Sequence, residues 1–436
     1  MEWWVILVVG LTLLLAAFMT GAPIFVAFLL INIAGVLILL GQPGFGLVAN
    51  SIFETTNIAA LSAVPLFILM GELLFRSGSI DILFDSVDKL VGKVKGRQYV
   101  LCIALSTIFG ALSGAAMGVA AMMARTLFPG MLDRGYDARM STGAILAGAS
   151  LAPIIPPSVL VIIIGTLANV SIAGLLIAGI LPGLMLSGMF LVYTLVRVRM
   201  NPELANEDAS TSTGVVTVKE KVFAVLRVAP FALIIFCVMG FILLGVATPS
   251  ESAATGVLGA LATAAYYRKL NLKMFTESLS SAAFITSMIL VIMASSKMFS
   301  QLLAFTGSTR ELTNVVAGLD LSAYVMLFIM MLIPFILCMF IDQIALMLVV
   351  IPIYQPLIKS LEFDPIWFWL LMLLNVTVGG ITPPFGYTIF AFKGATNRVT
   401  LQQVFSATWP FVLIFLVGML VIAGFPPIAT FLPGLL

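Results

Sequence analysis

Long apolar segments follow one another along most of the chain, with short polar stretches between them. Segments of roughly 20 apolar residues predict helices that span a membrane, and these lack the period-two alternation typical of a membrane β-barrel. The pattern therefore predicts an all-α polytopic membrane protein. The expected crossings are 3–20, 23–40, 58–77, 140–168, 173–196, 228–247, 250–267, 275–303, 366–392 and 402–425.

Two further apolar segments, 98–131 and 323–358, are interrupted near the middle, at 110–114 and 340–343. If each is a re-entrant hairpin that enters and leaves on one side, sixteen Lys and Arg residues collect on one face and two on the other. Such an asymmetry marks the richer face as cytoplasmic. We therefore predict two re-entrant helical hairpins and place both termini on the periplasmic side.

Two crossings, 140–168 and 366–392, contain adjacent prolines and are predicted to be broken helices. Proline has no N–H, and its ring clashes with the carbonyl four residues earlier, so each helix must open there. In hydrocarbon, unpaired backbone groups are tolerated only inside protein or beside a wet cavity, and matching breaks point to a transporter's binding site. The carbonyls expected to be freed are those of Ala152, Pro153, Gly379 and Gly380.

The same features recur along the chain at an offset of 227 residues. The offset relates Pro156 to Pro383, Pro157 to Pro384, Pro129 to Pro356 and Asp137 to Asp364. Each half then holds five crossings and one hairpin, and an odd number of crossings turns the second copy upside down. We predict an inverted repeat with halves 1–200 and 226–436, joined by a polar cytoplasmic linker at 201–225.

Composition narrows the function. Of the 436 residues 61% are hydrophobic and 9% are charged, with a mean hydropathy of +1.19, whereas soluble proteins carry about 25% charged residues. A formal net charge of +2, without a long basic run, indicates no nucleic acid partner. The chain has no histidine and no clustered carboxylates or metal-spaced residues, which argues against an intramembrane enzyme. We expect neither catalysis nor a cofactor.

Each half offers a hairpin tip and a broken helix, and folding would bring the two together near the membrane midplane. Unwound carbonyls suit a small hard cation, and the N-termini of half-helices suit an anion, so sodium and a carboxylate-bearing substrate fit both. The predicted sodium ligands are Ser113, Gly114, Ala152, Pro153, Asp342, Gly379, Gly380 and Thr382. The predicted substrate ligands are Ser113, Ser158, Asp342 and Thr382.

Several charged residues allow a second interpretation. Asp342 is expected to act at the site, to cap the second helix of its hairpin, or both. Arg125 lies 12 residues after the first tip, about 18 Å along a helix, which favours an interfacial anchor over a substrate clamp. Lys297 is expected to reach the periplasmic surface or a neighbouring subunit. Glu251 opens a helix, and the helix dipole explains an acid there without a functional role.

The ordered motifs together resemble the large membrane subunit of tripartite ATP-independent periplasmic (TRAP) transporters over nearly the whole chain. They are Gly110-Ala111-Leu112-Ser113-Gly114, Pro129-Gly130-Met131, Arg134-Gly135-Tyr136-Asp137, Ile155-Pro156-Pro157-Ser158, Ala178-Gly179-Ile180-Leu181-Pro182-Gly183, Ala247-Thr248-Pro249-Ser250-Glu251-Ser252-Ala253-Ala254 and Thr382-Pro383-Pro384-Phe385-Gly386. Relatives often carry Asp-Thr where this chain has Val119 and Ala120, and Glu where it has Gly130. With these departures, a first cation site would rely on carbonyls and Ser113.

The resemblance implies a sodium-driven, elevator-type importer in the bacterial inner membrane. It also implies two partners, a small four-helix membrane subunit and a periplasmic substrate-binding protein. The function predicted is sodium-coupled import of a small organic anion, with Na+ as the coupling ion and the only metal. The alternative is a stand-alone sodium–carboxylate symporter, since related inverted-repeat folds use similar hairpins.

Overall fold

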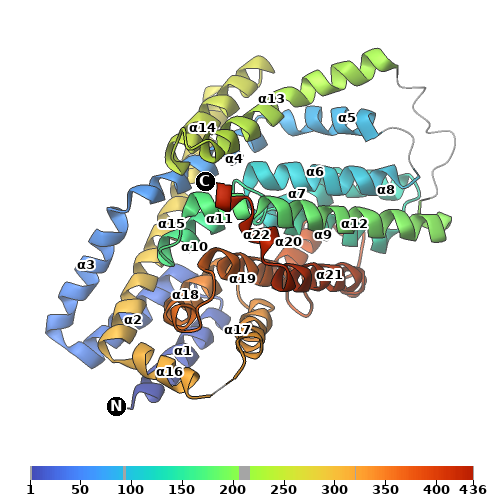
Figure 1. Cartoon of the computed structure of the whole chain (residues 1–436). Helices are drawn as coiled ribbons and strands as arrows, with labels where there is room; N and C mark the ends of the chain where they lie inside the picture. Colours follow the sequence, from blue (N-terminus) through green and yellow to red (C-terminus); the bar gives the residue numbers. More distant parts are fainter. Residues whose placement is uncertain (1, 92–94, 206–216, 320, 436) are drawn as a thin grey trace.

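The computed structural model describes residues 2–91, 95–205, 217–319 and 321–435, with the side chains at 79–81, 111, 113 and 317 outside the description. Its regular structure is helical, apart from one isolated bridge between Tyr136 and Ala205 (Figure 1). The first twelve α-helices are α1 (Trp3–Met19), α2 (Ile24–Leu40), α3 (Phe45–Thr56), α4 (Ala63–Arg76), α5 (Ser79–Val91), α6 (Arg97–Ser113), α7 (Ala116–Thr126), α8 (Phe128–Asp133), α9 (Ala138–Ser150), α10 (Val159–Leu167), α11 (Ile172–Ala178) and α12 (Ile180–Met200). The others are α13 (Val218–Leu243), α14 (Pro249–Tyr266), α15 (Leu272–Phe305), α16 (Ser308–Ala317), α17 (Ala323–Cys338), α18 (Gln343–Ser360), α19 (Pro365–Gly379), α20 (Tyr387–Ala395), α21 (Leu401–Gly424) and α22 (Pro427–Thr430).

The all-α membrane architecture predicted from the sequence is confirmed. Within the described ranges, six helical segments are long and apolar enough to cross a membrane, and several shorter helices are strongly apolar. Large apolar side chains are exposed along these helices, including Phe236 at 72% and Leu420 at 67%, as expected where lipid replaces water. The protein is therefore a multi-pass membrane protein.

Both predicted broken helices are present, and aspartates 227 residues apart start them. The Asp137 carboxylate accepts the N–H of Met140 at 2.7 Å and caps α9, and the Asp364 carboxylate accepts the N–H of Trp367 at 2.8 Å and caps α19. A cap satisfies one of the N–H groups left free in a helix's first turn. The chain then leaves the helix after Ser150 and after Gly379 and resumes it in α10 and α20.

Both hairpins are present too, although the first breaks later than predicted. Helix α6 runs through 110–113 and ends at Gly114, and α6 contacts α7 as α17 contacts α18. Glycine at 110 lets α6 pack closely on the broken helix, because a Cβ there would lie 2.7 Å from the Ala152 Cα. The second half has the reverse arrangement, since a Cβ at Gly379 would lie 2.7 Å from the Cys338 Cβ. A glycine on either partner permits the same close approach.

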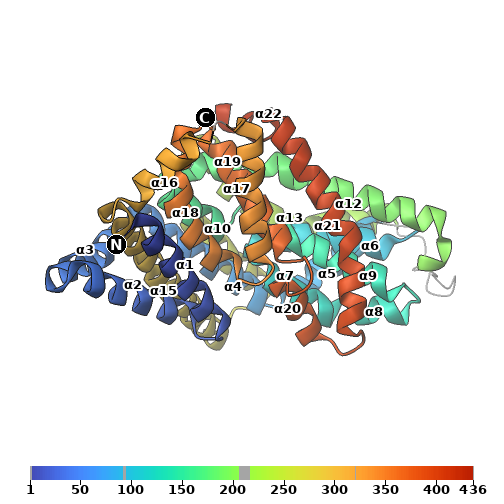
Figure 2. The same cartoon turned by 90° about the horizontal axis from the view of Figure 1, so that it is seen from below.

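The helices form two groups, and contacts between the halves are reciprocal. Helices α1 to α5 and α13 to α16 form an arc along the left and top of Figure 1, and the hairpins and broken helices gather beside it. Helix α7 of the first hairpin packs on α20, and α18 of the second hairpin packs on α10 (Figure 2). Likewise α2 packs on α15 and α14 packs on α4. Two related halves that exchange partners would make such contacts.

The boundaries 1–200, 201–225 and 226–436 stay predictions, and 206–216 lie outside the described residues.

Within the described ranges, three helices of ten residues or more were not predicted: α3, α5 and α16 are too short or too polar to register as crossings. Helix α3 explains Lys297, whose ammonium lies 2.7 Å from the Glu54 carboxylate, so that it pairs within the chain and needs no neighbouring subunit. The Glu251 carboxylate accepts the Thr248 N–H at 2.8 Å in a capping box, as the structural interpretation of that residue required.

The close approach of α6 and α9 gives a stability prediction. Gly110→Ala should lower the stability by about 1–3 kcal/mol, because the new methyl would meet the backbone of Ala152 and force the helices apart. Gly188→Ala in α12 is the control, since nothing lies within 4 Å of a Cβ there and alanine favours the helix. Thermal unfolding midpoints of the detergent-purified protein should fall for the first variant only; equal midpoints would contradict the packing argument.

Candidate functional site

The first hairpin tip lies against the first break. Gly114 ends α6 in the left-handed conformation with φ 63°, and its N–H donates to the Gly110 carbonyl at 2.7 Å. A Cβ on Gly114 would lie 3.3 Å from the carbonyl oxygen of Pro157. Glycine is therefore favoured at the tip for two reasons: it adopts this φ without strain, and it leaves room for the backbone of the break. Beyond the break, the buried Ser158 hydroxyl accepts the Val161 N–H at 3.4 Å and caps α10.

The second tip is joined to the second break by hydrogen bonds. The Gly386 N–H donates to the Met339 carbonyl at 3.2 Å. The Tyr387 hydroxyl donates to the side-chain amide oxygen of Gln343 at 2.7 Å. Each predicted pair of tip and break is thus in contact. Neither Tyr387 nor Gln343 was singled out from the sequence, although Tyr387 follows the Pro-Pro-Phe-Gly stretch directly.

Asp342 lies at the second tip, half-buried, at the start of α18. Its carboxylate accepts the N–H of Ile344 at 2.9 Å, so the capping role expected for it is present. The carboxylate also borders the cavity described below. The cap uses part of the acceptor capacity of the carboxylate, which has about four lone-pair sites, and the rest is available to a ligand.

The freed carbonyls differ between the two breaks. Among the described residues, neither the Ala152 nor the Pro153 carbonyl accepts a hydrogen bond. In the second break the Gly379 carbonyl accepts the Thr382 N–H and the Gly380 carbonyl accepts the N–H of Thr388, both at 3.1 Å. The expectation that both breaks free their carbonyls is therefore wrong for the second one, where the returning chain supplies donors.

The predicted hydroxyl groups are buried at the breaks. The Thr382 hydroxyl donates to the Val378 carbonyl at 2.7 Å, and its side chain is fully buried, as is that of Ser158. Each oxygen keeps acceptor capacity, which is what a cation needs. The side chain of Ser113 lies outside the described residues. No part of the structure tests these residues as ligands, so their roles stay predictions.

A cavity of about 290 Å³ collects both tips and both broken helices. The second group of helices contributes Gly114, Val159, Asp342 and Tyr387 to its wall, and the arc contributes residues from α4, α13 and α15. Most of the lining is apolar. The cavity therefore lies between the two groups of helices and has the size and character of a small-molecule site.

Glu72 of α4 is a second carboxylate in this wall, and the sequence analysis did not single it out. Arg76 lies 2.7 Å from Glu72 and 3.2 Å from Glu277 of α15, so it links two helices of the arc. A second hollow of about 470 Å³ shares Glu72 and Phe75 with the first. An acidic residue in an apolar crossing is itself a signal of function, and that signal could have found Glu72. Arg125 is exposed in the last turn of α7 and does not line the cavity, as an interfacial anchor requires.

The fold has a solved counterpart. The chain superposes on the crystal structure of the YdaH transporter of Alcanivorax borkumensis with a TM-score of 0.63, covering 90% of this chain and 91% of that one at 15% identity. At such identity the likeness establishes the fold alone.

Sequence comparison places the chain in a family. It is 30% identical to the ectoine/5-hydroxyectoine TRAP transporter large permease protein UehC of Ruegeria pomeroyi, over 86% of each chain. It is 28% identical to the C4-dicarboxylate TRAP transporter large permease protein DctM of Pseudomonas aeruginosa, over 88% of this chain and 89% of that one. Residues 11–428 match the family of the DctM component of tripartite ATP-independent periplasmic transporters. The paired tips, the broken helices and this match over almost the whole sequence make the chain a member of the TRAP large permease family, in which the relatives are transporters and not enzymes.

Proposed function

We propose that this permease imports a small organic acid by sodium-coupled, elevator-type alternating access. The observation that carries the proposal is the cavity between the two groups of helices, to which both hairpin tips and both broken helices contribute. A transporter that moves one group against the other needs its substrate at that boundary. The reciprocal contacts of α7 with α20 and of α18 with α10 support moving the hairpins and broken helices as one body.

The named substrates of the relatives support a carboxylate-bearing ligand. Similar permeases are named for the transport of ectoine, C4-dicarboxylates and sialic acid. In this chain the N-terminus of α7, at Ala116, lies in the cavity wall. The N–H groups of that first turn suit a carboxylate. We propose that four polar residues hold the ligand: Ser113, Ser158, Asp342 and Thr382. The hydroxyls of Ser158 and Thr382 are buried behind the residues that line the cavity.

Sodium coupling is proposed from the chemistry of the two breaks. The Ala152 and Pro153 carbonyls have no hydrogen-bond donor among the described residues, and Gly114 lies across the break from them. The second site would use the Asp342 carboxylate and the Thr382 hydroxyl with the Gly379 and Gly380 carbonyls. Oxygen ligands of these kinds suit a hard cation. The first site would bind through backbone carbonyls and Ser113, and the second with a formal charge.

A tripartite system requires two further components. We propose that these are a small four-helix membrane subunit and a periplasmic substrate-binding protein. The permease would lie in the bacterial inner membrane, with both termini on the periplasmic side. A stand-alone symporter would need neither, and reconstitution distinguishes the two.

Uptake in proteoliposomes tests the function directly. Labelled substrate of the co-encoded binding protein should accumulate only with an inward sodium gradient, the small membrane subunit and the binding protein. Replacing sodium by potassium should reduce the initial rate at least tenfold. Full-rate uptake without sodium would reject the coupling, and full-rate uptake by this chain alone would establish the stand-alone symporter.

Asp342→Asn separates the charge of Asp342 from its cap. Asparagine caps a helix as well as aspartate does, so the protein should stay folded, while loss of the charge should reduce sodium-driven uptake at least tenfold. Asp364→Asn, at the equivalent cap of α19, is the matched control and should transport normally. Equal uptake by both variants would leave Asp342 with a structural role only.

Thr382→Ala tests the proposed hydroxyl ligand. The sodium concentration for half-maximal uptake should rise by roughly three- to tenfold, since one neutral oxygen ligand contributes about 1 kcal/mol. Thr377→Ala is the matched control, because the Thr377 hydroxyl is also buried and donates at 2.7 Å to the carbonyl four residues earlier. The same sodium dependence in both variants would remove Thr382 from the site.

A further inference from the structure

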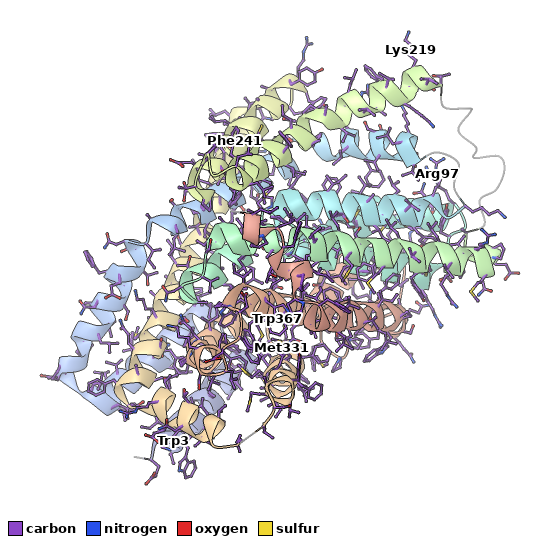
Figure 3. All side chains as sticks on the ribbon, viewed as in Figure 1. Trp3, Arg97, Lys219, Phe241, Met331 and Trp367 are labelled. Atoms are coloured by element: carbon purple, nitrogen blue, oxygen red, sulfur yellow. The ribbon has the colours of Figure 1, made fainter. Side chains whose placement is uncertain are left out.

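A third hollow lies away from the transport cavity, between α5 and α13. Its volume is about 430 Å³, and its wall carries the basic side chains of Lys89, Lys219 and Arg227. Lys89 is in the last turn of α5, and Lys219 is in the first turn of α13, at the outer end of that helix (Figure 3). Two helices that are distant in sequence thus direct positive charge to one place.

Among the described residues these three cations form no salt bridge, although Glu220 of the same wall interacts with Lys89 electrostatically. Arg76, Arg97 and Arg398, in contrast, each form one. Arg227 is held in position from two sides: its guanidinium lies 4.5 Å from the centre of the Phe223 ring, and its carbonyl accepts the Tyr267 hydroxyl at 2.9 Å. Three cations outnumber the one acid in this wall, and such an excess of positive charge favours an anion.

The surroundings of the hollow are apolar and exposed. Val222 and Phe223 line it with 55% and 53% of their surface exposed, and Leu226, one turn further, is 61% exposed. Contact of such an apolar surface with water is unfavourable, and acyl chains would remove it from water. The hollow lies on the face that the distribution of charge predicts to be cytoplasmic, where basic pockets between membrane helices hold anionic head groups.

We propose that this hollow binds the phosphodiester head group of an anionic phospholipid, with acyl chains along the exposed face of α13. The lysines would surround the phosphate as point charges, and Arg227 would donate through its guanidinium. Helix α5 also packs on α6 of the first hairpin, so the bound lipid would tie the arc to the moving group at this point. A free phosphate shares the chemistry of the head group but not the need for the apolar flank.

Glu220 is the one acid among the described residues of the wall, so replacing it should strengthen lipid binding, whereas replacing a lysine should weaken it. Its carboxylate accepts the N–H and the hydroxyl of Thr217, at 2.8 and 2.9 Å, in the capping box of α13. Glutamine can replace glutamate in a capping box. Glu220→Gln should therefore keep the helix start, remove one negative charge and tighten the binding of the lipid.

Native mass spectrometry measures the lipid affinity of the hollow. The full-length chain in detergent is titrated with phosphatidylglycerol or with phosphatidylcholine. Each cation beside an anionic head group contributes about fivefold in affinity. Lys89→Gln and Lys219→Gln should each weaken phosphatidylglycerol binding about fivefold, and the double variant roughly 25-fold, with phosphatidylcholine unaffected. Unchanged thermal unfolding in lipid-free detergent shows that the variants fold; if the double variant does not, the single variants decide.

Lys221→Gln is the matched control, because Lys221 lies on the same turn of α13 but does not line the hollow. Its affinity for phosphatidylglycerol should stay within about twofold of the unmodified chain. An equal loss in Lys221→Gln would mean that diffuse surface charge binds the lipid, and would overturn the proposal. Full displacement of the lipid by millimolar inorganic phosphate would also overturn it, by assigning the hollow to free phosphate.

Discussion

A backbone polar group cannot face hydrocarbon without a partner, and both halves of this molecule are arranged around that constraint. Each Pro-Pro pair opens a helix inside the membrane, and the tip of a hairpin covers each opening. Gly114 lies against the Pro157 carbonyl, and Gly386 donates to Met339. The hairpins then pack on the broken helix of the opposite half, so every opening is enclosed by protein. The transport cavity lies where this enclosure meets the arc.

Close packing of hairpin and broken helix needs one partner without a Cβ, and the halves meet this need differently. The first places the glycine on the hairpin, at Gly110, and the second places it on the broken helix, at Gly379. Function therefore constrains the distance between the helices more than the identity of either residue. A motif such as Gly-Ala-Leu-Ser-Gly consequently suggests a flexible break where the structure has a tightly packed helix.

The sequence was sufficient for the features that depend on local rules. Apolar length predicted the crossings, and proline chemistry predicted the openings between Ser150 and Val159 and between Gly379 and Tyr387. Helix α3 was not predicted because its 12 residues, which include Asn50, Ser51 and Glu54, form no apolar stretch of spanning length. The donors to the Gly379 and Gly380 carbonyls were missed for another reason. Thr382 closes a local turn on Gly379, and Thr388 reaches the Gly380 carbonyl only because the chain returns after the prolines, a path that no local pattern encodes.

The two proposed cation sites follow from this difference in pairing. In the first half, Val119 and Ala120 offer no polar side-chain atoms, and no donor among the described residues reaches the Ala152 and Pro153 carbonyls. At the second, the carbonyls are already engaged, and Asp342 supplies a formal charge at the tip. A carbonyl without a donor gains the full interaction with an ion, while an engaged one gains less, so a charged ligand is needed in the second half. A site without a charged ligand depends more on the shape of the break, which the packing of hairpin against broken helix fixes.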